Sequence, residues 1–191
     1  MSEDANRPRA LALVGMPGAG KTICAEYLRG RGYFTLRFGA VVVDEVQGRG
    51  WEVNPVNERI AREALRERHG MAAMAIISLP KLQEALKLHQ CIIIDGLYSF
   101  SEYKLLAEKL GAPLMLLAIA APRHLRYERL STRPERPLTP PEARERDIRE
   151  IEALEKGGPI AMADYTLIND GALAELLRQL DALLASLGFA P

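Results

Sequence analysis

A glycine-rich segment near the start of the chain carries residues whose types and spacing suit the binding of phosphate. Residues 15–22 read Gly-Met-Pro-Gly-Ala-Gly-Lys-Thr and fill every fixed position of the P-loop pattern G-x-x-x-x-G-K-[ST]. In this pattern, backbone N–H groups surround phosphate oxygens, the lysine reaches the β- and γ-phosphates, and the last hydroxyl binds Mg²⁺. We therefore expect a site for ATP and Mg²⁺ whose contacts come from Gly15, Pro17, Gly18, Ala19, Gly20, Lys21 and Thr22.

The residues on either side have the patterns that this loop requires. Ala10–Val14 is a short apolar run typical of a buried strand, and Ile23–Leu28 has the spacing of a helix that begins. The N-terminus of a helix adds partial positive charge beside a bound phosphate. The alternative is a glycine turn that only begins a helix. That interpretation leaves the lysine and the hydroxyl at their fixed positions unexplained.

An acid at the end of a second apolar run is the next candidate. Residues 91–96 read Cys-Ile-Ile-Ile-Asp-Gly, a pattern in which a buried strand delivers a carboxylate beside the metal and the phosphates. Beside a P-loop, this pattern predicts Asp95 either in the shell of the Mg²⁺ ion, with Thr22, or on the acceptor side of the site. The alternative is an aspartate that only opens the turn at Gly96.

Arginine is concentrated between residues 121 and 150. This segment holds eight arginines and no lysine: Arg123, Arg126, Arg129, Arg133, Arg136, Arg144, Arg146 and Arg149. Arginine suits planar, bidentate contacts with phosphate. The i, i+3, i+7 spacing of Arg126, Arg129 and Arg133 predicts one shared helix face. We expect arginines of this segment to stabilise the transferring phosphate, with a short lid at roughly residues 131–141.

Two segments also have a purely structural interpretation. The arginine-rich helices contain acid–arginine pairs four residues apart, Glu142–Arg146 and Glu145–Arg149, which favour a solvated, salt-bridged pair of helices. The long helical insertion, residues 39–88, either binds an acceptor opposite the γ-phosphate or only covers the sheet. Its candidate side chains are Asp44, Glu45, Trp51, Asn54, Asn57 and Arg59.

Strand-like and helix-like segments alternate along the chain. Its 191 residues suffice for a single domain, 1–191, with a substantial core. The alternation predicts an α/β fold in which a parallel sheet lies between two layers of helices. The expected strands are Ala10–Val14, Tyr33–Leu36, Cys91–Asp95, Leu114–Ala120 and Tyr165–Ile168.

Capping and breaking residues predict where the helices begin and end. Asn54 is an expected N-cap followed by proline, and Thr139 opens a capping box. Proline breaks hydrogen bonding inside a helix, so Pro80 is expected to interrupt the helix that contains it. Gly157-Gly158-Pro159 is expected to end the helix that begins at Thr139. The predicted helices are 56–69, one from 71 interrupted near 80, 139–156, and 172–187.

Composition and charge exclude several classes of protein. Lysine plus arginine equals aspartate plus glutamate at 25 each, which argues against a general nucleic-acid or membrane-surface binder. No signal peptide and no apolar run long enough to span a bilayer is present. Cys24 and Cys91 are expected to be reduced core residues, so we expect a cytoplasmic protein. No cysteine–histidine cluster has the spacing of a zinc site.

These motifs together resemble those of the dephospho-CoA kinase and adenylate kinase superfamily of P-loop kinases. The likeness covers nearly the whole chain and is closest to a mostly archaeal, nucleotide-kinase-like family. It rests on the P-loop, on Ile94-Asp95-Gly96, on Arg129-Leu130 with Arg133, and on the segment 163–171, Ala-Asp-Tyr-Thr-Leu-Ile-Asn-Asp-Gly.

The resemblance implies a three-layer αβα fold of the nucleoside-monophosphate-kinase type. It implies a five-stranded parallel sheet in the order 2-3-1-4-5, an acceptor-binding helical region and a short lid. It further implies that Arg129 and Arg133 approach the phosphates or the adenine edge of ATP, and that the loop around Asn169 lies near the adenine.

The chain departs from the family at two positions. Ala40 stands where these kinases have an aspartate after the second strand, and Asp44 lies one helical turn further on. Tyr98 occupies the region where an arginine usually follows the Asp-Gly step. Both departures concern the acceptor rather than the binding of ATP.

We expect a phosphotransferase that moves the γ-phosphate of ATP to a small nucleotide-like acceptor, a nucleoside monophosphate or a dephospho-CoA-like molecule. A phosphate acceptor is already ionised and needs no base, which suits an alanine at position 40. The alternatives are a nucleotide-binding switch or slow ATPase without a small-molecule acceptor, and a kinase-derived protein that binds nucleotide without chemistry. The sequence does not predict the oligomeric state.

Overall fold

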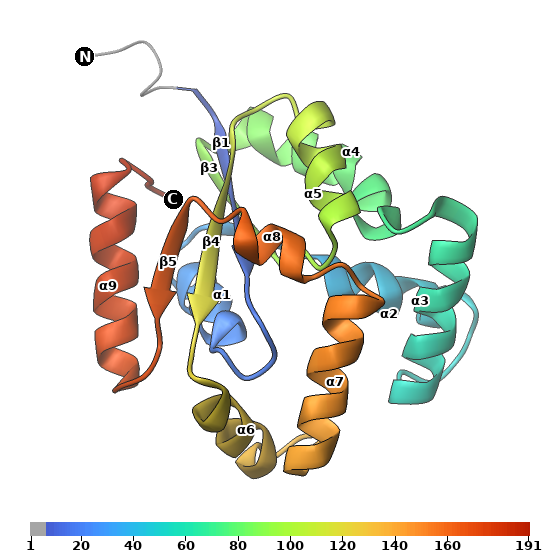
Figure 1. Cartoon of the computed structure of the whole chain (residues 1–191). Helices are drawn as coiled ribbons and strands as arrows, with labels where there is room; N and C mark the ends of the chain where they lie inside the picture. The colour runs from blue at the N-terminus through green and yellow to red at the C-terminus, as the bar shows by residue number, and fades with distance from the viewer. Residues whose placement is uncertain (1–6) are drawn as a thin grey trace.

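A five-stranded parallel sheet forms the centre of the computed structural model, which describes residues 7–191 (Figure 1). The strand order is β2-β3-β1-β4-β5, and every neighbouring pair is parallel, as expected. The strands are β1 (Arg9–Val14), β2 (Phe34–Arg37), β3 (Cys91–Asp95), β4 (Leu114–Ala120) and β5 (Tyr165–Ile168). All five predicted strands are confirmed to within a residue or two at each end.

Helices cover both faces of the sheet and its carboxyl edge (Figure 1). Their bounds are α1 (Lys21–Gly30), α2 (Phe38–Gly48), α3 (Pro55–His69), α4 (Ala73–Leu88), α5 (Phe100–Lys109), α6 (Arg123–Thr132), α7 (Pro140–Glu152), α8 (Gly157–Ala161) and α9 (Leu173–Ser186). One apolar cluster joins the sheet to α2, α3, α4 and α5, and a second joins it to α1 and α9. The three-layer P-loop kinase fold is confirmed.

The alternation of side chains along each strand divides the core. In β1, Ala10 and Ala12 belong to the first cluster, whereas Leu11 and Leu13 belong to the second. All four are fully buried, as a strand covered on both faces requires. The carboxyl ends of β1 and β3 are thereby fixed side by side, with Leu13 opposite Asp95.

Two helix predictions were wrong. Helix α4 runs through Pro80 without interruption, because apolar residues on both sides of the proline, such as Ala75 and Leu82, are buried in the core. Tertiary packing there offsets the hydrogen bond that proline removes. Helix α7 ends at Glu152 rather than at 156, and Gly157 begins α8 instead of ending a helix.

The other predicted helix signals are confirmed. Asn54 accepts a hydrogen bond from the Asn57 N–H at 2.9 Å and caps α3, and Thr139 forms a capping box with Glu142 at the start of α7. Cys24 and Cys91 are both free and buried. Within residues 7–191, no helix combines the length and the apolar character needed to cross a bilayer.

Candidate functional site

The P-loop connects the end of β1 to α1 and packs tightly against α6 and β5. Gly18 and Gly20 have positive φ angles of 78° and 105°, which favour glycine. A Cβ atom at Gly18 would lie 2.6 Å from the carbonyl oxygen of Arg126, and one at Gly20 would lie 2.4 Å from Nδ2 of Asn169. Only glycine therefore fits at these two positions of the predicted phosphate loop.

The N-terminus of α1 faces this loop without a side-chain cap. Its N-cap is Gly20, and no side chain accepts a hydrogen bond from the first turn. The first N–H groups of a helix have no partner inside the helix, so those of α1 remain available to an anion. The Thr22 side chain lies in this first turn and is exposed.

Lys21 and Asp95 meet at the carboxyl edge of the sheet. The distance from Lys21 Nζ to Asp95 Oδ1 is 3.4 Å, and the two side chains are 14% and 6% exposed. Asp95 is the last residue of β3 and pairs with Arg37 at the end of β2. The fold therefore places the predicted metal-binding carboxylate beside the P-loop lysine, at the edge where open α/β sheets bind their ligands.

Arg129 and Asn169 form a second wall of the P-loop. Asn169 donates through Nδ2 to the carbonyl oxygen of Ala19 at 2.9 Å, and Arg129 donates through Nη2 to the carbonyl oxygen of Asn169 at 3.0 Å. The Nη1 atom of Arg129 is buried and has no hydrogen-bond partner. The two residues that the resemblance assigned to the nucleotide thus contact each other, and Asn169 also contacts the loop.

Arg133 does not share the helix face of Arg126 and Arg129, contrary to our prediction. Helix α6 ends at Thr132, and Arg133 has extended backbone angles. Its Nε donates to the carbonyl oxygen of Arg136 at 2.5 Å, and Arg136 is paired with Glu58 of α3 at 3.0 Å. Burial and the nearby charge of Arg146 lower the pKa of Arg133. The lid loop is therefore held against the helical insertion by Arg136.

Arg126 has a structural role that the sequence did not indicate. Its buried guanidinium forms two hydrogen bonds with the carboxylate of Asp147, at 3.0 and 2.6 Å, and donates to the carbonyl oxygen of Pro17 at 3.0 Å. This side chain connects α6, α7 and the P-loop. The predicted pairs of the solvated alternative, Glu142–Arg146 and Glu145–Arg149, do not occur among the ion pairs of residues 7–191.

Lys156 is the second buried cation that sequence reasoning missed. Its ammonium pairs with Glu150, which also accepts a hydrogen bond from Arg146 Nε at 2.9 Å. Lys156 Nζ lies 5.4 Å from the centre of the Tyr98 ring, and Lys21 Nζ lies 5.8 Å from the same ring centre. Related kinases usually have an arginine in the region of Tyr98. In this protein a cation beside Tyr98 is supplied by Lys156, from the junction of α7 and α8.

The spacing of residues in α7 indicates that two of its acids, Asp147 and Glu150, face the core. Ala143, Asp147 and Glu150 follow an i, i+4, i+7 spacing and form the buried face of α7. Two acids on the inner face of a helix require cationic partners. No comparable pattern surrounds Lys156.

A cavity on the acceptor side lies between β2, α2, α3 and α4. Its volume is about 240 Å³, and Ala40 and Asp44 line it together with Leu36, Arg37, Val41, Glu45, Leu65, Ile77, Ser78 and Lys81. The Ser78 hydroxyl is buried and has no hydrogen-bond partner. Asp44 pairs with Lys81 across 3.8 Å. We call this the acceptor-side cavity.

The other candidates of the helical insertion have contacts of their own. Asn54 caps α3, and Asn57 donates to the carbonyl oxygen of Glu52 at 2.8 Å. Trp51 packs under the guanidinium of Arg49 and is 39% exposed. Among the acids, Asp44 and Glu45 line the acceptor-side cavity.

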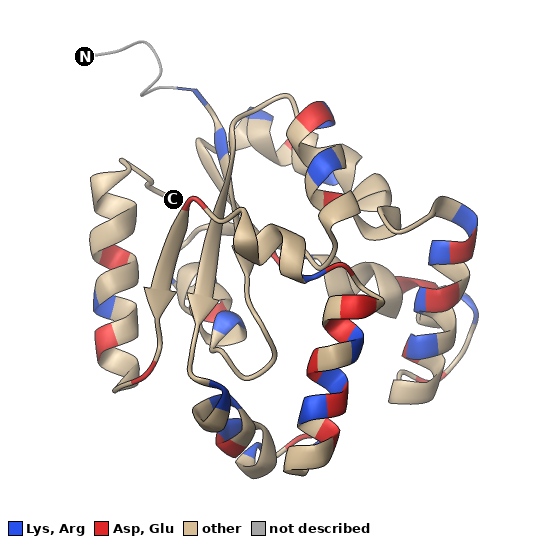
Figure 2. Ribbon diagram, in the orientation of Figure 1, with Lys and Arg blue, Asp and Glu red and all other residues tan. Residues whose placement is uncertain are grey.

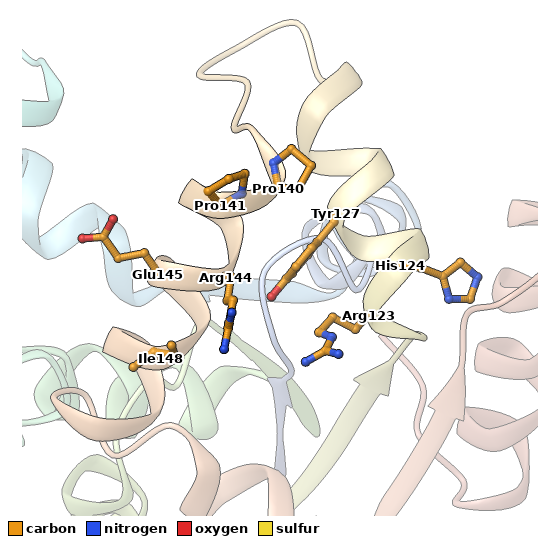
Figure 3. Close-up of a pocket in the computed structure, with 8 residues that line it drawn as sticks. All are labelled: Arg123, His124, Tyr127, Pro140, Pro141, Arg144, Glu145 and Ile148. Atoms are coloured by element: carbon orange, nitrogen blue, oxygen red, sulfur yellow. The ribbon is translucent and has the colours of Figure 1, made fainter.

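A larger cavity lies between α6 and α7. Its volume is about 910 Å³, and Figure 3 shows Tyr127 and Arg123 from α6 facing Arg144 from α7. Arg123 and Arg144 of the arginine-rich segment line it, but the residues expected at the P-loop do not. The size of a cavity alone therefore does not identify the nucleotide site here.

The residues at the P-loop fit a magnesium ion bound with a nucleotide. Mg²⁺ binds through one or two protein oxygens, phosphate oxygens and water rather than through a cage of side chains. Thr22 and Asp95 offer a hydroxyl and a carboxylate beside the loop. Within residues 7–191, no group of three histidine, cysteine, aspartate or glutamate side chains forms an alternative metal site.

Solved structures share this fold. TT1252 from Thermus thermophilus aligns with a TM-score of 0.62 and 23% identity over 94% of this chain and 98% of its own. A gluconokinase from Sinorhizobium meliloti 1021 gives a TM-score of 0.57 at 17% identity, covering 95% of this chain and 94% of its own. A shikimate kinase from Acinetobacter baumannii in complex with shikimate gives 0.54 at 17% identity, covering 95% of this chain and 96% of its own. At these identities the likeness concerns the fold alone.

Sequence relatives define the family. A UPF0200 protein from Hyperthermus butylicus is 36% identical over 180 residues, which cover 93% of this chain and 94% of that protein. A UPF0200/UPF0201 protein from Archaeoglobus fulgidus is 34% identical over 182 residues, and this chain spans only 56% of its length. The family model described as "AAA domain" matches residues 11–153. The chain therefore belongs to the UPF0200 family and carries the AAA domain that this model describes.

Proposed function

We propose that this protein is an ATP- and Mg²⁺-dependent phosphotransferase that moves the γ-phosphate of ATP to a small acceptor. The observation that carries the proposal is the meeting of Lys21, Asp95 and the uncapped N-terminus of α1 at one edge of the sheet. Binding of phosphate and metal at that edge follows from the chemistry of these groups.

The balance of charge around the loop supports a highly anionic ligand. Six cationic side chains surround the loop and α7: Lys21, Arg126, Arg129, Arg133, Arg146 and Lys156. Four ion pairs join these cations to only three acids, Asp95, Asp147 and Glu150. Figure 2 shows acidic and basic residues following one another along α7. The six named cations outnumber their three acidic partners, which suits a triphosphate because a triphosphate brings several negative charges to one place.

Phosphoryl transfer requires positioning and charge neutralisation more than covalent catalysis. We assign Lys21 to the β- and γ-phosphates, and Thr22 and Asp95 to the Mg²⁺ ion, which neutralises the charge that develops between those phosphates. The bond from the γ-phosphorus to the departing ADP oxygen breaks as an acceptor oxygen bonds to the phosphorus. We assign Arg129 and Asn169 to the adenine side and Arg133 to the closed lid.

The acceptor-side cavity is the proposed place of the acceptor. It begins one strand away from Asp95, because Arg37 at its wall pairs with Asp95 in the sheet. The resemblance favours a nucleoside monophosphate or a dephospho-CoA-like acceptor. A phosphate acceptor needs no base, whereas a hydroxyl acceptor would pass its proton to Asp95. Small acceptors are also supported by the fold neighbours, a gluconokinase and a shikimate kinase that holds shikimate.

A nucleotide-binding switch or slow ATPase is the second candidate, and Ala40 favours it. No acid lines the cavity at that position, and Asp44, one turn further on, is paired with Lys81. An acceptor screen separates the two functions. Steady release of ADP that depends on one added acceptor supports the kinase, whereas slow hydrolysis unchanged by every acceptor supports the switch.

Replacement of the P-loop lysine tests the site itself. Lys21→Ala should lower the turnover of ATP by about 100-fold or more, because a preorganised cation is lost at the group in transit. Lys104→Ala is the matched control, since Lys104 is an exposed lysine on α5. Turnover of Lys21→Ala at the wild-type rate, measured by ADP release, would contradict the assignment.

A further inference from the structure

Lys156 is buried beside the phosphate site without belonging to the P-loop. The residue is 3% exposed and lies at the start of α8, far from Lys21 in the sequence. The two ammonium groups nevertheless approach the same aromatic ring, that of Tyr98, at 5.4 and 5.8 Å from its centre. Tyr98 in turn packs over Gly96, directly after Asp95. The fold thus brings a second lysine to the side of the site where Lys21 and Asp95 meet.

The ion pair with Glu150 does not by itself explain this lysine. Glu150 already accepts a charge-assisted hydrogen bond from Arg146 at 2.9 Å, so one carboxylate faces two cations. A buried charge without full compensation is costly. Burial, and to a smaller extent the charge of Lys21, lower the pKa of Lys156, whereas Glu150 opposes the shift. Lys21 and Lys156 are each paired with one acid, and Arg146 brings a further cation to the acid that Lys156 uses.

We propose that Lys156 is a positioning residue of the phosphate site, whose charge favours the terminal phosphate of a bound nucleoside triphosphate. The inference rests on the proposed function, because Lys21 is there assigned to the β- and γ-phosphates. Lys156 acts through the electric field rather than by contact, since its side chain is buried behind Tyr98 and held by Glu150. Glu150 has the opposite influence and partly cancels the charge of Lys156.

This arrangement predicts effects of opposite sign for two neighbouring residues. Lys156→Met removes a positive charge and should lower the preference for a triphosphate over a diphosphate, by about tenfold for charges several ångströms apart in a partly buried site. Glu150→Gln removes a negative charge and should raise the same preference. The double variant Lys156→Met, Glu150→Gln keeps the net charge of the wild type. Its preference for a triphosphate over a diphosphate should therefore be close to that of the wild type.

Calorimetry with two probes tests the inference. The affinities of the magnesium complexes of ADP and of a non-hydrolysable ATP analogue are measured for the wild type and each variant. The quantity compared is the ratio of the two affinities, since a merely structural role of Lys156 would weaken both nucleotides alike. Lys156→Arg keeps the charge and should keep the ratio. Lys104→Met is the matched control, because Lys104 is an exposed residue of α5 whose Nζ also lies near an aromatic ring, 5.2 Å from the centre of Phe100.

The affinity ratio tests the role of Lys156, whereas binding by the wild type tests the proposed function. A ratio that is unchanged in Lys156→Met, or lowered equally in Lys104→Met, overturns the role of Lys156 while the wild type still binds nucleotide. Absence of binding in the wild type overturns the proposed function instead. If thermal unfolding shows that Lys156→Met does not fold, the rise expected for Glu150→Gln becomes the deciding result, and its absence overturns the inference.

Discussion

At the scale of single residues, Glu102 is a buried acid that contacts Tyr98 and has a strongly raised pKa. It is fully buried at the start of α5, where its Oε2 accepts hydrogen bonds from the N–H groups of Tyr98 at 2.7 Å and Ser99 at 3.0 Å. Its Oε1 has no partner. Burial raises the pKa of Glu102 to about 7, although both backbone N–H groups and Arg66 oppose the shift.

This perturbation predicts a pH dependence of stability. The folded state binds the Glu102 proton more tightly than the unfolded chain, whose value is 4.5. Its contribution to stability is therefore complete below pH 4.5 and lost as the pH rises through about 7. Glu102→Gln cannot ionise and should lose less stability than the wild type between pH 5 and pH 8, by up to about 3 kcal/mol.

Urea unfolding at the two pH values measures this difference. Glu84→Gln is a suitable control, because Glu84 lies on the surface of α4 and pairs with Lys87. An equal change of stability with pH in the wild type and in Glu102→Gln would rule out the role of this carboxyl group.

At the scale of elements, α7 supports the P-loop through Arg126 of α6. Its inward acids lie one turn apart, and Asp147 holds the guanidinium that also donates to Pro17. The backbone of α6 approaches the same point, since the carbonyl oxygen of Arg126 leaves no room for a side chain at Gly18. The arginine-rich helices thus support the loop as well as supplying charge.

Breaking the pair between α6 and α7 should separate stability from nucleotide binding. Asp147→Asn leaves the buried Arg126 without its carboxylate and should lower the free energy of unfolding by roughly 3 kcal/mol. The double variant Arg126→Met, Asp147→Leu removes both charges and should recover most of that stability. It should still bind Mg²⁺-ATP several-fold more weakly than the wild type, because the hydrogen bond to Pro17 is lost.

Unfolding by denaturant and calorimetry with Mg²⁺-ATP provide the two measurements. Arg178→Met on α9 serves as the control, since its pair with Glu175 is exposed. Full recovery of nucleotide affinity in the double variant would show that Arg126 does not support the loop.

At the scale of the whole molecule, the carboxyl edge of the sheet gathers segments that are far apart in the sequence. The P-loop follows β1, Asp95 ends β3, Asn169 follows β5, and the lid contacts α3 through Arg136 and Glu58. A ligand bound at this edge would contact several of these segments at once. Its binding should therefore stabilise the fold as a unit.

Linkage gives the size of this effect. Mg²⁺-ATP at 100 times its Kd should raise the free energy of unfolding by about 2.7 kcal/mol, which thermal unfolding detects as a higher Tm. Lys21→Ala should lose most of that increase, and magnesium without nucleotide should produce little of it. A Tm that stays constant when Mg²⁺-ATP is added would contradict the nucleotide site.

The sequence by itself determined the parts of this protein that depend on neighbours along the chain. The P-loop, the strand that ends in Asp95 and the caps at Asn54 and Thr139 are local patterns, set by backbone conformation and by the period of apolar residues. The parallel sheet followed from the alternation of elements, and its order followed from the family resemblance. The roles assigned to Lys21, Thr22, Asp95, Arg129, Arg133 and Asn169 remain predictions.

Only the tertiary structure decided which distant groups meet. Asn169 contacts Ala19 across 150 positions, and Arg126 reaches Asp147 across 21. Tertiary packing also keeps α4 continuous through Pro80, although the proline predicts a break. It brings Lys156 to Tyr98, which no local pattern predicts. The physical reason is that a buried charge must find its partner in space, and the chain topology, rather than the spacing of residues, determines which partner is near.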